Sequence, residues 1–168
     1  MLFRSFSVSI AAVWKGEIVA GVVFHPLLNE LFTATKGGGA FLNGKKLKVT
    51  TNNSPNKAII ATGFPTNVED DPQLCIEVFV HMLRQGFPIR RIGSACLDLA
   101  YVAAGRFDAF WEVVLQPWDV AAGRLLIEEA GGKVTDYAGN TLNPLRAGPV
   151  LATNAHLHPY LQKAIAKP

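Results

Sequence analysis

Residues 116–123, with the sequence QPWDVAAG, combine side chains that could bind a charged ligand. Asp119 lies at the expected start of a helix, where an aspartate could simply cap the helix and complement its dipole. Capping does not explain the small residues Ala121, Ala122 and Gly123, because glycine inside a helix costs about 1 kcal/mol relative to alanine. We therefore expect a metal ion or a phosphate group to approach this first turn closely.

A second group of such residues lies upstream, in the sequence RRIGSA at 90–95. Gly93 and Ser94, at the expected start of another helix, leave backbone N–H groups free for an oxyanion or a sugar hydroxyl. Asp108 and Glu112 follow on an extended segment, and their spacing places both on one side of a strand, within reach of a polyol. A capped helix beside two solvated carboxylates explains the same residues, so both interpretations stay open.

Other patterns that suggest chemistry have simpler explanations. Residues 39–45, GAFLNGK, fit a phosphate-binding loop, but Lys46 stands where a metal-binding hydroxyl should be, and the Asn-Gly pair indicates a hairpin. The four histidines are scattered, without the spacing of a metal site. Cys75 and Cys96 lie in apolar stretches outside any nucleophile or disulfide motif, which favours reduced, buried thiols.

The elements that must position these residues fall into two groups. Alternating apolar residues predict an antiparallel meander with strands over 6–14, 18–24, 30–35, 40–42 and 46–49. After the polar stretch 50–56, strands are expected over 57–62, 89–92, 107–112, 134–137 and 150–153. Helices are expected over 73–85 with Asp71 as cap, over 94–104, over 120–130 and after Asn154. The sequence thus predicts an α/β protein with a sheet portion at 1–50 and an α/β subdomain at 57–168.

Composition excludes several classes of protein. The 168 residues are 49% hydrophobic and 17% charged, which rules out intrinsic disorder. The net charge of +3 is spread along the chain and predicts no nucleic-acid partner. The longest apolar run, 18–24, is broken by Gly21 and falls short of the roughly 20 residues of a membrane-spanning helix. We expect a cytoplasmic protein with no membrane partner.

Together, these segments resemble the inositol monophosphatase family of magnesium-dependent, lithium-sensitive sugar phosphatases. The stretch WDVAAG at 118–123 is similar to the C-terminal signature of that family. The resemblance extends over FSVSI at 6–10, GGAFLNG at 38–44, GSACLDLAYVAAGRFD at 93–108 and EAGG at 129–132. It is greatest to the bacterial-type inositol-1-phosphatases. It implies a layered α/β/α/β/α sandwich, Mg²⁺ as cofactor, a phosphate monoester as substrate and usually a homodimer.

The resemblance also implies roles for particular residues. Asp119 matches the C-terminal metal-ligand aspartate of the family, and Glu112 matches a carboxylate that contacts substrate hydroxyls. The backbone at 93–95 matches a segment that lines the sugar site, and Asp108 matches a nearby acidic position. The substrate-binding residues implied in this way are Gly93, Ser94, Ala95, Glu112 and Asp108.

The sequence departs from the family pattern at its start. Before the segment that resembles 6–10, family members carry a glutamate-bearing helix and an Asp-Pro-x-Asp-Gly-Thr loop that supply the other metal carboxylates. A two-metal hydrolase needs several carboxylates around ions about 4 Å apart, and the acidic run at 69–71 precedes a helix in an expected surface loop. We therefore expect a truncated, inactive portion of a phosphatase in which metal-activated water attacks inositol or sugar monophosphates.

Two alternatives stay open. The chain could be a catalytically silent binding or regulatory module that pairs with a full-length relative. It could also belong to a related phosphatase that acts on 3′-phosphoadenosine phosphate or fructose bisphosphate, in which case Arg90, Arg91 and Glu112 are the positions that would discriminate between substrates.

Overall fold

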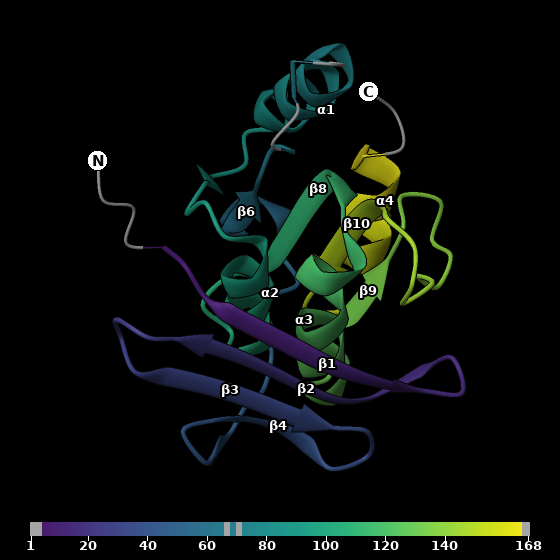
Figure 1. Ribbon diagram of the computed structural model, residues 1–168. Coiled ribbons are helices and arrows are strands. Elements are labelled where there is room, and N and C mark those ends of the chain that lie inside the picture. Colours follow the sequence, from purple (N-terminus) through teal and green to yellow (C-terminus); the bar gives the residue numbers. More distant parts are fainter. Residues whose placement is uncertain (1–4, 66–67, 70–71, 166–168) are drawn as a thin grey trace.

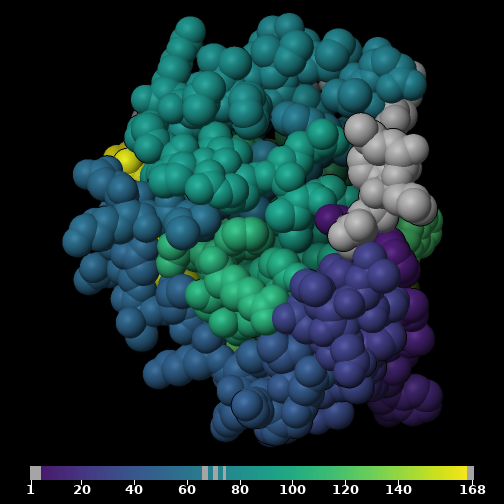
Figure 2. All heavy atoms as spheres, turned by 90° about the vertical axis from the view of Figure 1, so that its left-hand side faces the viewer, coloured from purple at the N-terminus to yellow at the C-terminus, as the bar shows by residue number. Residues whose placement is uncertain are grey.

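The computed structural model describes residues 5–65, 68–69 and 72–165, which form alternating layers of sheet and helix in the order β/α/β/α (Figure 1). Figure 2 shows the layers from the side, with the first sheet at the bottom and the segment around α1 at the top. The first sheet contains, in spatial order, β1 (Val8–Trp14), β2 (Glu17–His25), β3 (Glu30–Thr35), β4 (Gly39–Leu42) and β5 (Lys45–Lys46). The second contains β7 (Ile89–Arg90), β6 (Ile60–Thr62), β8 (Ala109–Leu115), β10 (Gly148–Thr153) and β9 (Lys133–Thr135).

The helices cover defined faces of these sheets. One core cluster joins the first sheet, α2 (Ala95–Ala103), α3 (Pro117–Glu129) and one face of the second sheet. Another joins the opposite face of the second sheet to α1 (Pro72–Arg84) and α4 (His158–Ile165). The layered α/β architecture expected from the sequence is therefore confirmed. The subdomain boundary at 50–57 stays a prediction, since the first core contains residues from both sides of it.

The antiparallel meander is also confirmed, with differences at its end. Asn43 and Gly44 both have positive φ, 48° and 78°, as a tight hairpin turn requires. The last strand ends at Lys46 instead of residue 49, because the Val49 N–H leaves the sheet and donates to the carbonyl of Ala130 at 3.1 Å. The strand expected from residue 57 begins at Ile60, because a 3-10 helix (Pro55–Lys57) precedes it.

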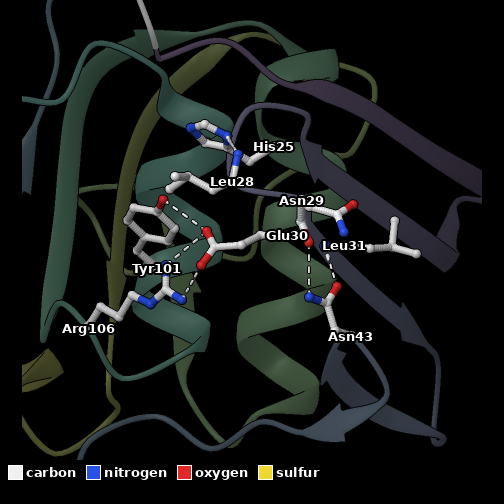
Figure 3. Close-up of polar contacts among 8 residues, drawn as sticks. All are labelled: His25, Leu28, Asn29, Glu30, Leu31, Asn43, Tyr101 and Arg106. Carbon is white, nitrogen blue, oxygen red and sulfur yellow. Dashed lines mark hydrogen bonds and ion pairs between the residues drawn. The ribbon is translucent and has the colours of Figure 1, made fainter.

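An ion pair fixes the first sheet to α2 (Figure 3). Glu30 accepts hydrogen bonds from both terminal nitrogens of Arg106, at 3.0 and 2.5 Å, and from the Tyr101 hydroxyl at 3.1 Å. The hydrogen bonds from Arg106 lower the pKa of Glu30. Because Glu30 begins β3 and Tyr101 lies in α2, this cluster sets the position of the meander relative to the helix layer.

The small residues of α3 serve helix packing. A Cβ atom added to Gly123 would lie 2.5 Å from the Cβ of Leu99 on α2, and one added to Gly21 on β2 would lie 3.0 Å from the Cα of Ala122. Helix α3 thus approaches a helix and a strand at distances that larger side chains would prevent. This corrects the expectation that a ligand requires these small residues; the close approach is made by α2 and β2.

Two further expectations concern the helices. The expected cap of α1, Asp71, lies outside the described residues, while Gly86 follows the helix with a φ of 80° as a helix stop requires. None of the helices in the described part of the chain combines the length and the apolar character needed to cross a bilayer.

We expect the substitution Gly123→Ala to lower the free energy of unfolding, although alanine is the better helix former. The added methyl group collides with Leu99, and overpacking of this kind costs about 1 to 3 kcal/mol. Urea denaturation measures the change. Gly148→Ala is the matched control, because its Cβ would meet no atom within 4 Å, and a Gly123→Ala protein as stable as this control would contradict the packing explanation.

Candidate functional site

A cleft of about 780 Å³ opens where the starts of α2 and α3 meet β8 and the residue before β1. Ser7, Gly63 and Gln116 form part of its wall. Its charged wall residues are Arg91, Asp98, Glu112 and Asp119. Polar groups from four separate elements therefore converge on one hollow, as in small-molecule binding sites.

The start of α2 presents backbone groups to this cleft. Gly93 adopts a φ of 89°, which turns the chain into the helix, and Gly93, Ser94 and Ala95 all line the cleft. Ser94 holds the cap position but makes no capping hydrogen bond; its hydroxyl lies 3.4 Å from that of Ser7. The first N–H groups of α2 thus lack a side-chain acceptor from the cap, and they can bind an anion or a hydroxyl group.

Asp119 lies on the cleft wall at the start of α3, but it is not the helix cap. Gln116 holds the cap position, and Asp119 is the third residue of the helix. The Gln116 N–H donates to Oδ2 of Asp119 at 3.1 Å, which fixes the carboxylate at the positive end of the helix dipole. The carboxylate also lines the cleft, where it can accept further hydrogen bonds.

Glu112 extends from β8 into the same cleft and is 4% exposed. Burial and then the nearby charge of Asp119 raise the pKa of Glu112 to about 7, while Arg91 acts in the opposite direction. At neutral pH this group exchanges between its neutral and ionised forms, so it can both donate and accept hydrogen bonds. Its carboxyl packs against Gly63, where an added Cβ would lie 2.2 Å from Oε2 of Glu112.

Asp98 is a cleft residue that sequence reasoning missed. It is 1% exposed, and burial followed by the charge of Glu112 raises its pKa to about 8. Within the described residues, its Oδ1 atom has no hydrogen-bond partner. The available signal was a carboxylate between Leu97 and Leu99 on an otherwise apolar helix, since unpaired buried charges are rare outside functional sites.

Asp108 lies apart from the other proposed site residues. It is buried before the start of β8, where it accepts hydrogen bonds from Thr50 Oγ1 at 2.5 Å and from the Ile59 N–H at 2.9 Å. Four residues of extended chain, about 13 Å, separate it from Glu112. The cleft thus brings together Gly93, Ser94, Ala95, Glu112 and Asp119 but not Asp108, which ties the linker after β5 to the second sheet.

The acidic residues of the cleft do not build a magnesium site by themselves. Among the described residues, no three aspartate, glutamate, histidine or cysteine side chains lie close enough to hold one metal ion. Mg²⁺ requires near-octahedral coordination by oxygen atoms, and Asp119 could supply one such ligand.

Sequence comparison relates the chain to known phosphatases. The model of the inositol monophosphatase family matches residues 2–167. The chain is 47% identical over 163 residues to an inositol-1-monophosphatase of Rhizobium meliloti, covering 97% of this chain and 61% of that protein. It is 47% identical over 149 residues to the Nus factor SuhB of Escherichia coli, covering 89% of this chain and 55% of that protein. The chain therefore spans little more than half the length of these relatives.

Solved structures show the same fold. An inositol monophosphatase from Anabaena (Nostoc) superposes with a TM-score of 0.89 at 40% identity, covering 96% of this chain and 64% of that one. The extragenic suppressor protein suhB from Bartonella henselae gives a TM-score of 0.87 at 42% identity, covering 98% and 65%.

We expect Asp98→Asn to stabilise the protein increasingly as the pH rises. The folded state retains the Asp98 proton up to about pH 8, whereas the unfolded chain releases it near the ordinary pKa of 3.8. The stability that this proton confers on the folded state is fully present below pH 3.8 and is lost as the pH rises towards about 8. The variant avoids that loss, which we expect to reach roughly 1 to 3 kcal/mol.

Urea denaturation at a series of pH values tests this expectation. Glu69→Gln is the control variant, because it removes one carboxyl group from an exposed position. An Asp98→Asn difference that stays constant between about pH 4 and pH 8 would show that this carboxyl is not a buried, unpaired acid.

Proposed function

Because the chain belongs to the inositol monophosphatase family, we propose that its cleft binds the phosphate monoester of a polyol. In this proposal the cleft is the substrate-binding part of a magnesium-dependent phosphomonoesterase. The observation that supports this most directly is the convergence of the α2 start, Glu112 and Asp119 on one cleft. A cytoplasmic location, a homodimer and the lack of a nucleic-acid partner stay predictions.

Each group in the cleft suits one part of such a substrate. Glu112 is poised near neutrality, so it can pair with polyol hydroxyls, which are both donors and acceptors. The backbone at 93–95 offers N–H donors to a hydroxyl or an anionic oxygen. Arg91 adds a positive charge at the wall that can pair with a phosphate oxygen.

The proposed magnesium chemistry requires more ligands than the cleft contains. When bound, Mg²⁺ would activate a water molecule and neutralise the leaving oxygen. Asp119 is the residue of this chain that would hold such an ion, but it does not complete a coordination sphere among the described residues. We therefore propose that these 168 residues on their own bind substrate without hydrolysing it.

We expect the purified chain to release no phosphate from inositol 1-phosphate above a blank, at any magnesium concentration. A colorimetric phosphate assay, with the complete Rhizobium meliloti relative as the positive control, measures this. Robust phosphate release that the substitution Asp119→Asn abolishes would show that the chain is active. It would still support the proposed phosphatase function.

We also expect inositol 1-phosphate to bind weakly and saturably in the cleft. In NMR titrations the amide signals of Gly93, Ser94 and Ala95 should shift, and Glu112→Ala should weaken binding about tenfold, because hydrogen bonds to charged groups contribute about 1.5 to 3 kcal/mol. Glu128→Ala, outside the cleft, is the control. Parallel titrations with fructose bisphosphate and 3′-phosphoadenosine phosphate rank the substrate classes, and shifts that avoid the cleft would refute the site.

A second candidate function is that of a catalytically silent module that binds a partner, and the Escherichia coli relative carries the name Nus factor SuhB instead of a phosphatase name. In this case the chain would pair with a complete relative. Co-expression of the tagged chain with the Rhizobium meliloti protein tests the idea. Co-purification of the two polypeptides supports it, and a chain that elutes alone or aggregates contradicts it.

A further inference from the structure

Gly63, the residue directly after β6, is a glycine that its own backbone does not require. Its φ lies outside the positive range that favours glycine, in contrast to the φ of 89° at Gly93. Glycine loses more conformational freedom on folding than any other residue, so an alanine with the same backbone conformation would favour the folded state. The reason for a glycine at this position must therefore lie in its surroundings.

The carboxyl group of Glu112 occupies the space beside Gly63. Strands β6 and β8 lie side by side and pair in parallel, with Thr62 opposite Trp111, so the next residues of the two segments are neighbours (Figure 1). A Cβ atom added to Gly63 would lie 2.2 Å from Oε2 of Glu112, 2.9 Å from its Cδ and 3.3 Å from its Oε1. These three carboxyl atoms are the nearest neighbours of that position. The absent side chain thus leaves room for this one functional group.

Phe64, the next residue, positions a charge of the opposite sign. The guanidinium carbon of Arg91 lies 5.0 Å from the centroid of the Phe64 ring, which is a cation–π contact. The ring packs edge-on against Phe79 of α1, at a centroid distance of 5.7 Å. Phe64 and Arg91 both line the cleft. The ring therefore restricts the guanidinium to one part of the cleft wall.

The two charged groups lie close enough to influence each other. Arg91 lowers the pKa of Glu112, against the larger effects of burial and of Asp119, which raise it. Asp98 is the other acidic residue of the wall, and its own pKa is raised by burial and then by the charge of Glu112. A carboxyl group and a cation placed side by side suit a ligand that carries hydroxyl groups next to an anionic group.

We propose that Gly63 and Phe64 are positioning residues that determine which ligand the cleft accepts. Gly63 leaves the Glu112 carboxyl in the place where it meets a hydroxyl group, and Phe64 keeps Arg91 in the place where it meets a phosphate group. This inference rests on the proposed function of the cleft. It makes the cleft selective for a phosphate group attached to a polyol, since each residue serves one part of that ligand.

NMR titrations with inositol 1-phosphate and with inorganic phosphate test the role of Gly63. The substitution Gly63→Ala must displace the Glu112 carboxyl by about 1 Å, since ordinary contacts begin near 3.4 Å, and binding groups need tighter placement than this. We expect about tenfold weaker binding of inositol 1-phosphate, as for Glu112→Ala, and unchanged binding of inorganic phosphate. Gly148→Ala is the matched control, because its Cβ meets no atom within 4 Å and the residue does not line the cleft.

A double-mutant cycle separates positioning from a general effect on the fold. In a Glu112→Ala protein there is no carboxyl group to displace, so adding Gly63→Ala should change the affinity for inositol 1-phosphate by less than about twofold. Equal losses of affinity with and without the Glu112 carboxyl would show that Gly63 acts in another way, and would overturn its role.

The substitution Phe64→Leu tests the other half of the proposal. It removes the cation–π contact and releases Arg91, so we expect inositol 1-phosphate and inorganic phosphate to bind about threefold more weakly. Binding of free inositol, which has no phosphate group, should not change. A variant that binds all three probes more weakly to the same extent would contradict this role. Circular dichroism and urea denaturation verify that both variants are folded.

Crystal structures of the original chain and of Gly63→Ala give a readout that needs no ligand. We expect the Glu112 carboxyl to turn into the cleft while the backbone of β6 and β8 stays in place, because the colliding atoms end a flexible side chain. A carboxyl that stays in place while the backbone shifts would overturn the proposal. If the carboxyl turns but the original chain does not bind inositol 1-phosphate, the proposed function is wrong and the positioning of Glu112 by Gly63 stands.

Discussion

The contact between α3 and its two neighbours determines the geometry of the cleft. Gly123 allows α3 to approach Leu99 on α2, and Gly21 allows β2 to approach Ala122 from the other side. Because the two helices pack this closely, their first turns lie side by side and their N-terminal N–H groups face one hollow. A binding site for an oxyanion is therefore a consequence of helix packing: the residues that create it lie in the core, one turn away from those that contact solvent.

The cleft retains groups that reduce the stability of the fold. The buried Asp98 has an oxygen atom without a hydrogen-bond partner among the described residues, and Glu112 is buried near the charge of Asp119. Apolar residues at these positions would remove both costs. Carboxyl groups kept under such conditions hold protons at neutral pH, which ordinary surface carboxylates do not. The same burial that destabilises them gives the cleft groups that can both donate and accept hydrogen bonds.

Local patterns in the sequence were sufficient for much of this architecture. The Asn-Gly turn and the alternating apolar residues indicated the meander. The grouping of Asp119, Glu112 and residues 93–95 in one site was implied by the resemblance to the family, since local patterns indicated only two helix starts and a strand between them. Asp108 lies outside the cleft that Glu112 lines, because strand periodicity specifies a face of the strand but not which end of the sheet the residue occupies. Asp98 was overlooked because its burial depends on how α2 meets β8, which helix periodicity does not reveal. The small residues of α3 were assigned to a ligand because their partners, Leu99 and Gly21, are distant in sequence.

The last strand of the first sheet has a consequence for aggregation. Strand β5 is two residues long and consists of Lys45 and Lys46. A short, cationic edge strand offers few backbone groups to another strand and repels a second edge of the same charge. The sequence therefore protects this edge of the sheet against the growth of a fibril.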